Sequence, residues 1–84
     1  MITAKVIDVQ KGDGDTAQVC LRIERDEEGN DFVKITAWHF DEDVNPYLQE
    51  TQMKFTRDNF DLCAEYIENF SGTMAQNFVD RFEI

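Results

Sequence analysis

The chain is poor in the residues from which catalytic and metal sites are built. It has one histidine, His39, one serine, Ser71, and two cysteines, Cys20 and Cys63, which are far apart and form no C-x-x-C pair. A Ser-His-acid triad would have to use Ser71, which falls in a turn expected to end a helix. A zinc site needs about four Cys or His ligands at close spacing. We therefore expect no catalytic residue, no metal, no cofactor and no enzymatic activity.

Basic residues and long apolar runs are also scarce. Eight Lys and Arg face 18 Asp and Glu, which gives a formal net charge of -10 at pH 7. Tight binding to a nucleic-acid backbone requires Lys and Arg, and anionic membranes repel an acidic protein. No apolar run approaches the roughly 20 residues of a membrane span. We therefore expect no direct contact with nucleic acid or membrane. Both cysteines lie in apolar patterns, which predicts reduced, buried thiols and a cytoplasmic location, with one disulfide left open.

The hydrophobic residues present, 42% of 84 positions, suffice for one domain over residues 1–84. Residues 2–9, 16–25 and 32–40 are predicted strands, because β-branched residues or two-residue alternation mark them. Turns at 11–15 and 25–31 join them into an antiparallel meander. Residues 41–50, with the only proline, Pro46, are a predicted loop, and 52–55 a short fourth strand.

The third predicted strand is apolar on both faces. Val33, Ile35 and Ala37 point one way, and Phe32, Trp38 and Phe40 point the other. Because aromatic side chains usually fill cores, we expect partial burial of the aromatic face under the 41–50 loop, with exposure as the alternative.

Two helical segments are expected after the strands. Thr56 is a predicted N-cap for a helix over 57–70, which Ser71-Gly72 ends. Thr73, with Gln76 three residues on, is typical of a capping box that starts a second segment. Its helical stripe consists of Met74, Ala75, Phe78, Val79 and Phe82, although a terminal strand also fits. The predicted class is α+β: an antiparallel three- to four-stranded meander packed against one or two C-terminal helices.

The helix predicted over 57–70 has two distinct faces. Phe60, Cys63, Ala64, Ile67 and Phe70 form the apolar one, and Asp58, Asp61, Glu65 and Glu68 form the opposite one. Successive carboxylates are about 4.5–6 Å apart along the axis, not far from phosphates on a nucleic-acid strand. This face is either an ordinary solvated surface or a mimic of nucleic acid.

The order of elements from Val33 to Phe70 resembles that of the single-stranded-DNA-binding transcriptional coactivator domains. Those domains bind nucleic acid through basic and aromatic strands, whereas the strands here offer only Lys5, Arg22, Lys34 and Lys54. The resemblance therefore carries no function over. In size and charge, the chain is similar to the small acidic inhibitors that phages use against nucleases and CRISPR effectors.

The first functional hypothesis is an inhibitor of the phage anti-CRISPR or anti-restriction type, acting in the host cytoplasm as a monomer or homodimer. It would occupy the basic groove of a nucleic-acid-binding protein such as a nuclease or CRISPR effector. Its contacts would be Asp58, Asp61, Glu65 and Glu68, assisted by Asp41, Glu42 and Asp43, with Trp38, Phe40 and Tyr47 as a second set. The alternative is a generic interaction module or accessory subunit that binds through the aromatic sheet face. A third possibility, nucleic-acid binding by the sheet, predicts a mobility shift with single-stranded DNA, and we expect none.

Overall fold

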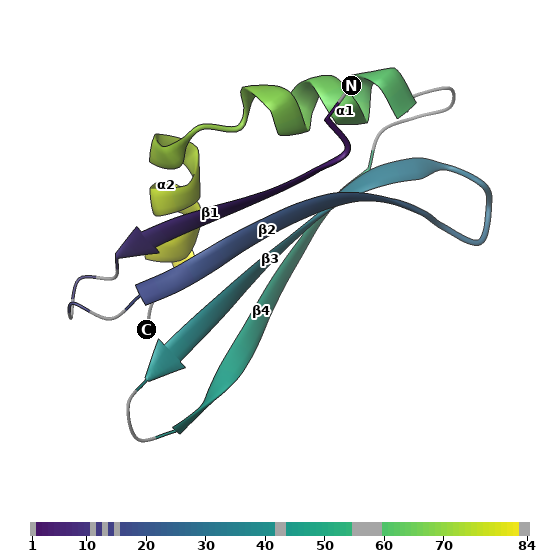
Figure 1. Cartoon of the computed structure of the whole chain (residues 1–84). Coiled ribbons are helices and arrows are strands. Elements are labelled where there is room, and N and C mark those ends of the chain that lie inside the picture. The colour runs from purple at the N-terminus through teal and green to yellow at the C-terminus, as the bar shows by residue number, and fades with distance from the viewer. Residues whose placement is uncertain are drawn as a thin grey trace.

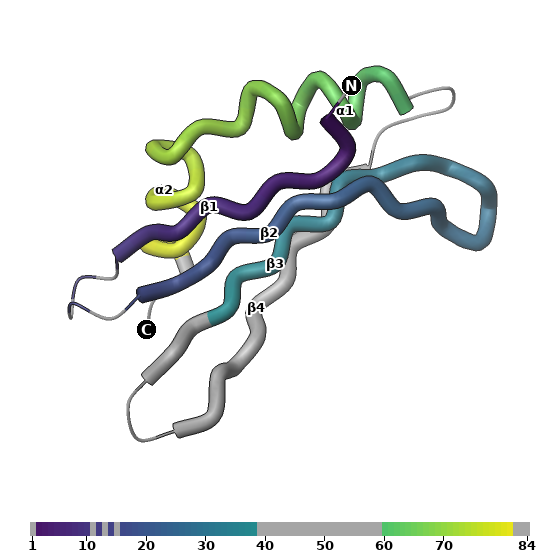
Figure 2. Tube along the Cα trace, viewed as in Figure 1, coloured from purple at the N-terminus to yellow at the C-terminus, as the bar shows by residue number. Residues whose placement is uncertain are grey.

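A computed structural model describes residues 2–10, 12, 14, 16–41, 44–54 and 60–82; for 39–41, 44–54 and 82 it describes the backbone alone (Figure 2). The elements are β1 (Ala4–Gln10), β2 (Thr16–Arg25), β3 (Asp31–Asp41), β4 (Val44–Lys54), α1 (Phe60–Asn69) and α2 (Gly72–Phe82). The strands form one antiparallel sheet in the order β1-β2-β3-β4, and both helices lie on one of its faces (Figure 1). The predicted α+β class is confirmed.

The first three strands follow the alternation of the sequence. Val19 on β2 lies opposite Ile7 on β1 and Ala37 on β3. Alternate residues of β2, namely Ala17, Val19 and Leu21, are buried. Successive side chains point to opposite faces, so this register places one apolar face of the sheet under the helices.

The turn between β2 and β3 is stabilised by Asp26. Its carboxylate Oδ1 accepts hydrogen bonds from the backbone N–H of Glu28 at 3.0 Å and of Asn30 at 2.9 Å. Gly29 has φ of 86°, a conformation that other residues adopt at a cost. The turn predicted at this position is confirmed.

The prediction of a loop over 41–50 is wrong. β3 continues to Asp41 and pairs with β4, which begins at Val44. Pro46 is tolerated because β4 ends the strand order, and a strand at the sheet edge has one side without ladder hydrogen bonds. The register also shifts between His39 and Asp41, beside this proline, as at a β-bulge.

The two helices correct two details of the prediction and decide between the two alternatives for the last segment. α2 is capped by Ser71, whose Oγ accepts a hydrogen bond from the N–H of Met74 at 3.2 Å, so the cap is not Thr73. The segment from residue 74 is helical to Phe82, which excludes the alternative of a strand there. Met74, placed in the apolar stripe, is exposed. Thr56 lies outside the described residues.

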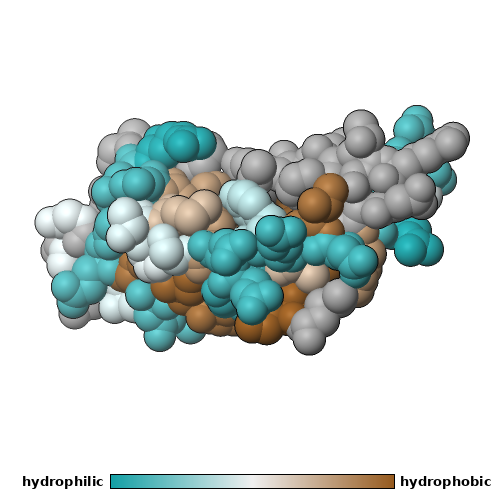
Figure 3. All heavy atoms as spheres, turned by 90° about the horizontal axis from the view of Figure 1, so that it is seen from above, coloured by the Kyte–Doolittle hydropathy of each residue, from teal (hydrophilic) through white to brown (hydrophobic). Residues whose placement is uncertain are grey.

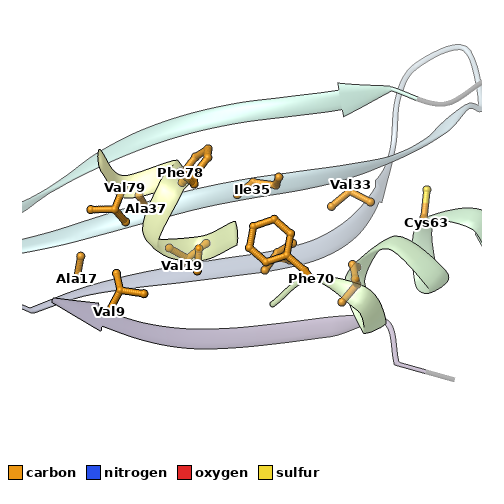
Figure 4. Close-up of a cluster of buried hydrophobic side chains, with 13 residues drawn as sticks. Val9, Ala17, Val19, Val33, Ile35, Ala37, Cys63, Phe70, Phe78 and Val79 are labelled. Carbon is orange, nitrogen blue, oxygen red and sulfur yellow. The ribbon is translucent and has the colours of Figure 1, made fainter. Parts of the chain in front are cut away.

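The core lies between the helices and the covered face of the sheet. Figure 4 shows side chains from α1 and α2, among them Cys63 and Val79, lying over Val9, Val19 and Val33 on the strands. Burial of these side chains is what holds the helices on the sheet.

Candidate functional site

Three of the four carboxylates predicted for the helix surface stand in solvent. Asp61, Glu65 and Glu68 on α1 are exposed, and we call them the acidic row. Among the residues whose side chains are described, none of the three forms an ion pair or a side-chain hydrogen bond. Asp58 lies outside the described residues. The row is therefore open to a partner and is not neutralised by the protein's own described cations.

Burial and one lysine hold the helix beneath the acidic row in place. Cys63, Ala64 and Ile67 are buried against the sheet, as the apolar pattern predicted. The Lys5 ammonium on β1 donates to the backbone carbonyl of Glu68 at 2.9 Å and of Phe70 at 3.1 Å. Carbonyls at the end of a helix lack partners within it, and a cation there also complements the dipole. Sequence reasoning missed this contact, because 63 residues separate Lys5 from Glu68.

The surface around the acidic row is not uniformly polar. Leu62, which follows Asp61 on α1, is 51% exposed, and Phe60, predicted to be buried, is exposed too. A shallow hollow of about 320 Å³ is lined by Leu62, Glu65, Tyr66 and Asn69. Seen from above, hydrophilic and hydrophobic surface lie side by side (Figure 3). A partner that contacts the row would therefore also meet apolar side chains.

Trp38, the one member of the second predicted contact set whose side chain is described, lies on the other side of the sheet. Trp38 is 37% exposed. It follows buried Ala37, which packs under the helices, so Trp38 points to the opposite face of the sheet. We call this the uncovered face, because neither α1 nor α2 lies on it. The acidic row, on α1, is on the covered side. The structure therefore does not bring Trp38 and the row together on one surface.

The outcome for the other predicted aromatic and acidic contacts is mixed. Phe32, on the same face as Trp38, is only 6% exposed and cannot serve as an exposed contact. The side chains of Phe40, Asp41, Glu42, Asp43 and Tyr47 lie outside the described residues. On the same face of the sheet, Val6 is exposed and Cys20 half-buried, and the residue directly opposite Trp38 on β2 is Gln18.

Both cysteines are free thiols. Cys63, on the buried face of α1, packs against the sheet; burial raises the pKa of its thiol, an effect to which the Asp31 carboxylate adds. Burial also raises the pKa of the half-buried Cys20 thiol, although Arg22 acts against it. A raised pKa keeps a thiol protonated and lowers its reactivity as a nucleophile.

Comparison with protein-family models, curated proteins and solved structures finds no match for this chain. Within the described residues, no three His, Cys, Asp or Glu side chains form a group that could hold a metal ion. In the same part of the chain, no helix is long and apolar enough to cross a membrane.

Proposed function

We propose that this protein is a non-enzymatic inhibitor that places the acidic row of α1 in the basic groove of a nucleic-acid-binding protein. The observation that supports it is the row itself: three exposed carboxylates, unpaired among the described residues, on one face of an anchored helix. A nuclease or CRISPR effector is the class of partner that offers such a groove, because its groove is built to bind phosphates.

Electrostatics favours this kind of partner. With a formal net charge of -10, the protein attracts cationic surfaces and accelerates encounter with them. Asp61 and Glu65, four residues apart, repel each other, and a like-charge pair of this kind destabilises a helix by about 0.2–0.5 kcal/mol. Carboxylates that destabilise their own helix in this way are expected on a surface that contacts a cationic partner.

Rigidity of the support adds to the argument. α1 is fixed by buried Ile67 on one side and by Lys5 at its end, so the carboxylates start from a defined arrangement. Less ordering entropy is then lost on binding. Phage origin and action in the host cytoplasm belong to the same proposal, as does a monomeric or dimeric state.

Displacement of DNA tests the proposal. Purified nucleases and CRISPR effectors are loaded with fluorescent duplex DNA, and its release by this protein is followed by anisotropy. We expect release by at least one effector class, with competition that weakens steeply between about 50 and 200 mM salt, as for contacts that replace several phosphates.

Two triple variants of equal net charge distinguish the effect of the acidic row from the effect of net charge alone. Asp61→Asn, Glu65→Gln and Glu68→Gln together should abolish displacement with the circular dichroism spectrum unchanged. The control neutralises three exposed acids elsewhere, Asp8, Glu27 and Glu28, and should retain it. Equal activity of the two triple variants would reject the acidic row as the contact.

The uncovered face of the sheet supports a second candidate function. Trp38 is exposed there, and tryptophan is enriched at the centres of protein interfaces. A generic interaction module or accessory subunit would bind through this face, with acidity serving solubility. Its binding would change little with salt and would be lost in Trp38→Ala, whereas neutralising the acidic row would leave it intact.

A further inference from the structure

A pocket opens where α1 and α2 meet above β3. Its volume is about 200 Å³, and its apolar wall consists of Ile35, Phe70, Met74 and Phe78. Figure 4 shows Phe70 and Phe78 reaching onto the strands from the helical side. Drug-sized ligands usually occupy about 300–1,000 Å³. A cavity of about 150 Å³ already holds benzene, so this pocket has room for one ring with a short arm.

The polar part of the lining includes a charged group. Tyr66, Asn77 and Arg81 form this part, and none of the described residues that line the pocket carries a carboxylate. Tyr66 and Phe70 also stack with ring centroids 5.8 Å apart at a tilt of 56°. The lining therefore combines aromatic surface with a guanidinium, an amide and a phenol.

Arg81 stands out among the described cations. Arg22 pairs with Glu24 at 2.8 Å and Arg25 with Asp31 at 3.1 Å, while Lys34 lies 3.9 Å from Glu24. Lys5 is bonded to two carbonyls. Among these residues, Arg81 alone has neither an ion pair nor a hydrogen bond. In a chain with 18 acidic residues, its five N–H donors remain available to a ligand.

The positive charge of Arg81 acts on the space inside the pocket. Burial raises the pKa of the Tyr66 phenol, and Arg81 opposes that rise, which places the guanidinium within electrostatic reach of this wall. Arg81 also lies in the last turn of α2, where a cation complements the helix dipole. The helix dipole explains a cation at this position, but it does not explain why the guanidinium lies beside an apolar pocket.

We propose that this pocket binds a small monocarboxylate with one aromatic ring. The ring would lie against Phe70, Phe78 and Met74, and the carboxylate would accept hydrogen bonds from Arg81, a pair that is frequently bidentate. Because the net charge of -10 repels anions in general, such a ligand needs a direct cationic contact, and Arg81 supplies it. This site is independent of the acidic row and of the function proposed for it.

A titration with 3-phenylpropanoate tests the site on the unmodified chain. Amide NMR spectra of the ¹⁵N-labelled protein should shift at residues 66, 70, 77 and 81 with a Kd in the millimolar range or below. The neutral isostere 3-phenylpropanamide should bind about tenfold more weakly, because it cannot form the charged pair. Absence of shifts at these residues, or equal affinity for acid and amide, would overturn the proposal.

A pair of arginine variants assigns the preference for the acid to Arg81. Arg81→Gln should bind acid and amide equally, whereas Arg25→Gln, on the β2–β3 side of the protein, should keep the tenfold difference. A preference for the acid that survives in Arg81→Gln would show that another cation binds it and would refute the site as proposed. The comparison of acid with amide in the unmodified protein decides the matter even if Arg81→Gln does not fold.

Discussion

At the scale of the residue, Ile67 and Leu62 differ in surroundings more than in chemistry. Both lie on α1, but Ile67 is fully buried, whereas half of the Leu62 side chain is in solvent. Ile67→Ala should lower the free energy of unfolding by about 2–5 kcal/mol, because it removes buried methyl groups and leaves a cavity. Leu62→Ala should change it by no more than about 0.5 kcal/mol. Urea unfolding of both variants checks the contrast, and equal losses would mean that α1 does not pack as described.

The two thiols should also separate in a labelling experiment. Ellman's reagent at pH 8 should modify Cys20 slowly, because burial raises its pKa and so lowers the thiolate fraction. Cys63, which has no exposed surface, should react only after unfolding in urea. A Cys20→Ser variant gives the assignment, since it should show almost no labelling in the folded state. Rapid modification of both thiols in the folded protein at pH 8 would contradict the buried position of Cys63.

Single residues also show what periodicity can and cannot predict. The buried face of α1 follows from its helical spacing, which identified Cys63, Ala64 and Ile67 correctly. The same spacing placed Phe60 in the core, but Phe60 is exposed in the first turn of α1. Periodicity gives the direction of a side chain and not how far the helix overlaps the sheet beneath it.

At the scale of the element, the start of α2 offers a direct test. Ser71→Ala should cost about 1 kcal/mol of stability, because the N–H of Met74 loses its side-chain acceptor. Thr73→Ala is the matched control and should cost less than about 0.5 kcal/mol, since Thr73 is an exposed residue of the first turn. Thermal unfolding of the two variants distinguishes them. A greater loss of stability in Thr73→Ala than in Ser71→Ala would show that Thr73 is the N-cap, as the Thr73–Gln76 spacing predicted.

The strands show why one element was predicted well and another was not. β2 was predicted from Thr16 to Arg25 because its apolar residues alternate without interruption. The first part of β4 was predicted as a loop, which contained Pro46, and only a short strand over 52–55 was predicted after it. Only the strand order shows that β4 is an edge where proline is tolerated. Whether a strand lies at the edge or in the centre is a property of the assembled sheet, and the local sequence does not determine it.

At the scale of the whole molecule, the sheet separates the acidic row from Trp38. The acidic row and Trp38 were both candidates from sequence, and nothing in the sequence says which face of β3 the helices cover. Once Val33, Ile35 and Ala37 are buried under the helices, Trp38 must point to the far side. The two candidate functions therefore use different surfaces, and variants on one face leave the other unchanged.

The excess of negative charge should make folding and binding respond to salt in opposite directions. Repulsion among 18 acidic side chains opposes compaction, and salt screens it with a Debye length of about 10 Å at 0.1 M. Raising NaCl from about 20 to 300 mM should therefore stabilise the fold by about 1 kcal/mol, which is a Tm increase of roughly 4–8 °C for a domain of this size. The variant Asp61→Asn, Glu65→Gln, Glu68→Gln should show a smaller rise, because it carries less repulsion.

Over the same range of salt, displacement of DNA from a partner should weaken, since the contact is itself electrostatic. Differential scanning fluorimetry and the anisotropy assay in matched buffers measure the two effects. A Tm that falls with salt would mean that attractive ion pairs, and not repulsion, dominate the surface of the folded protein.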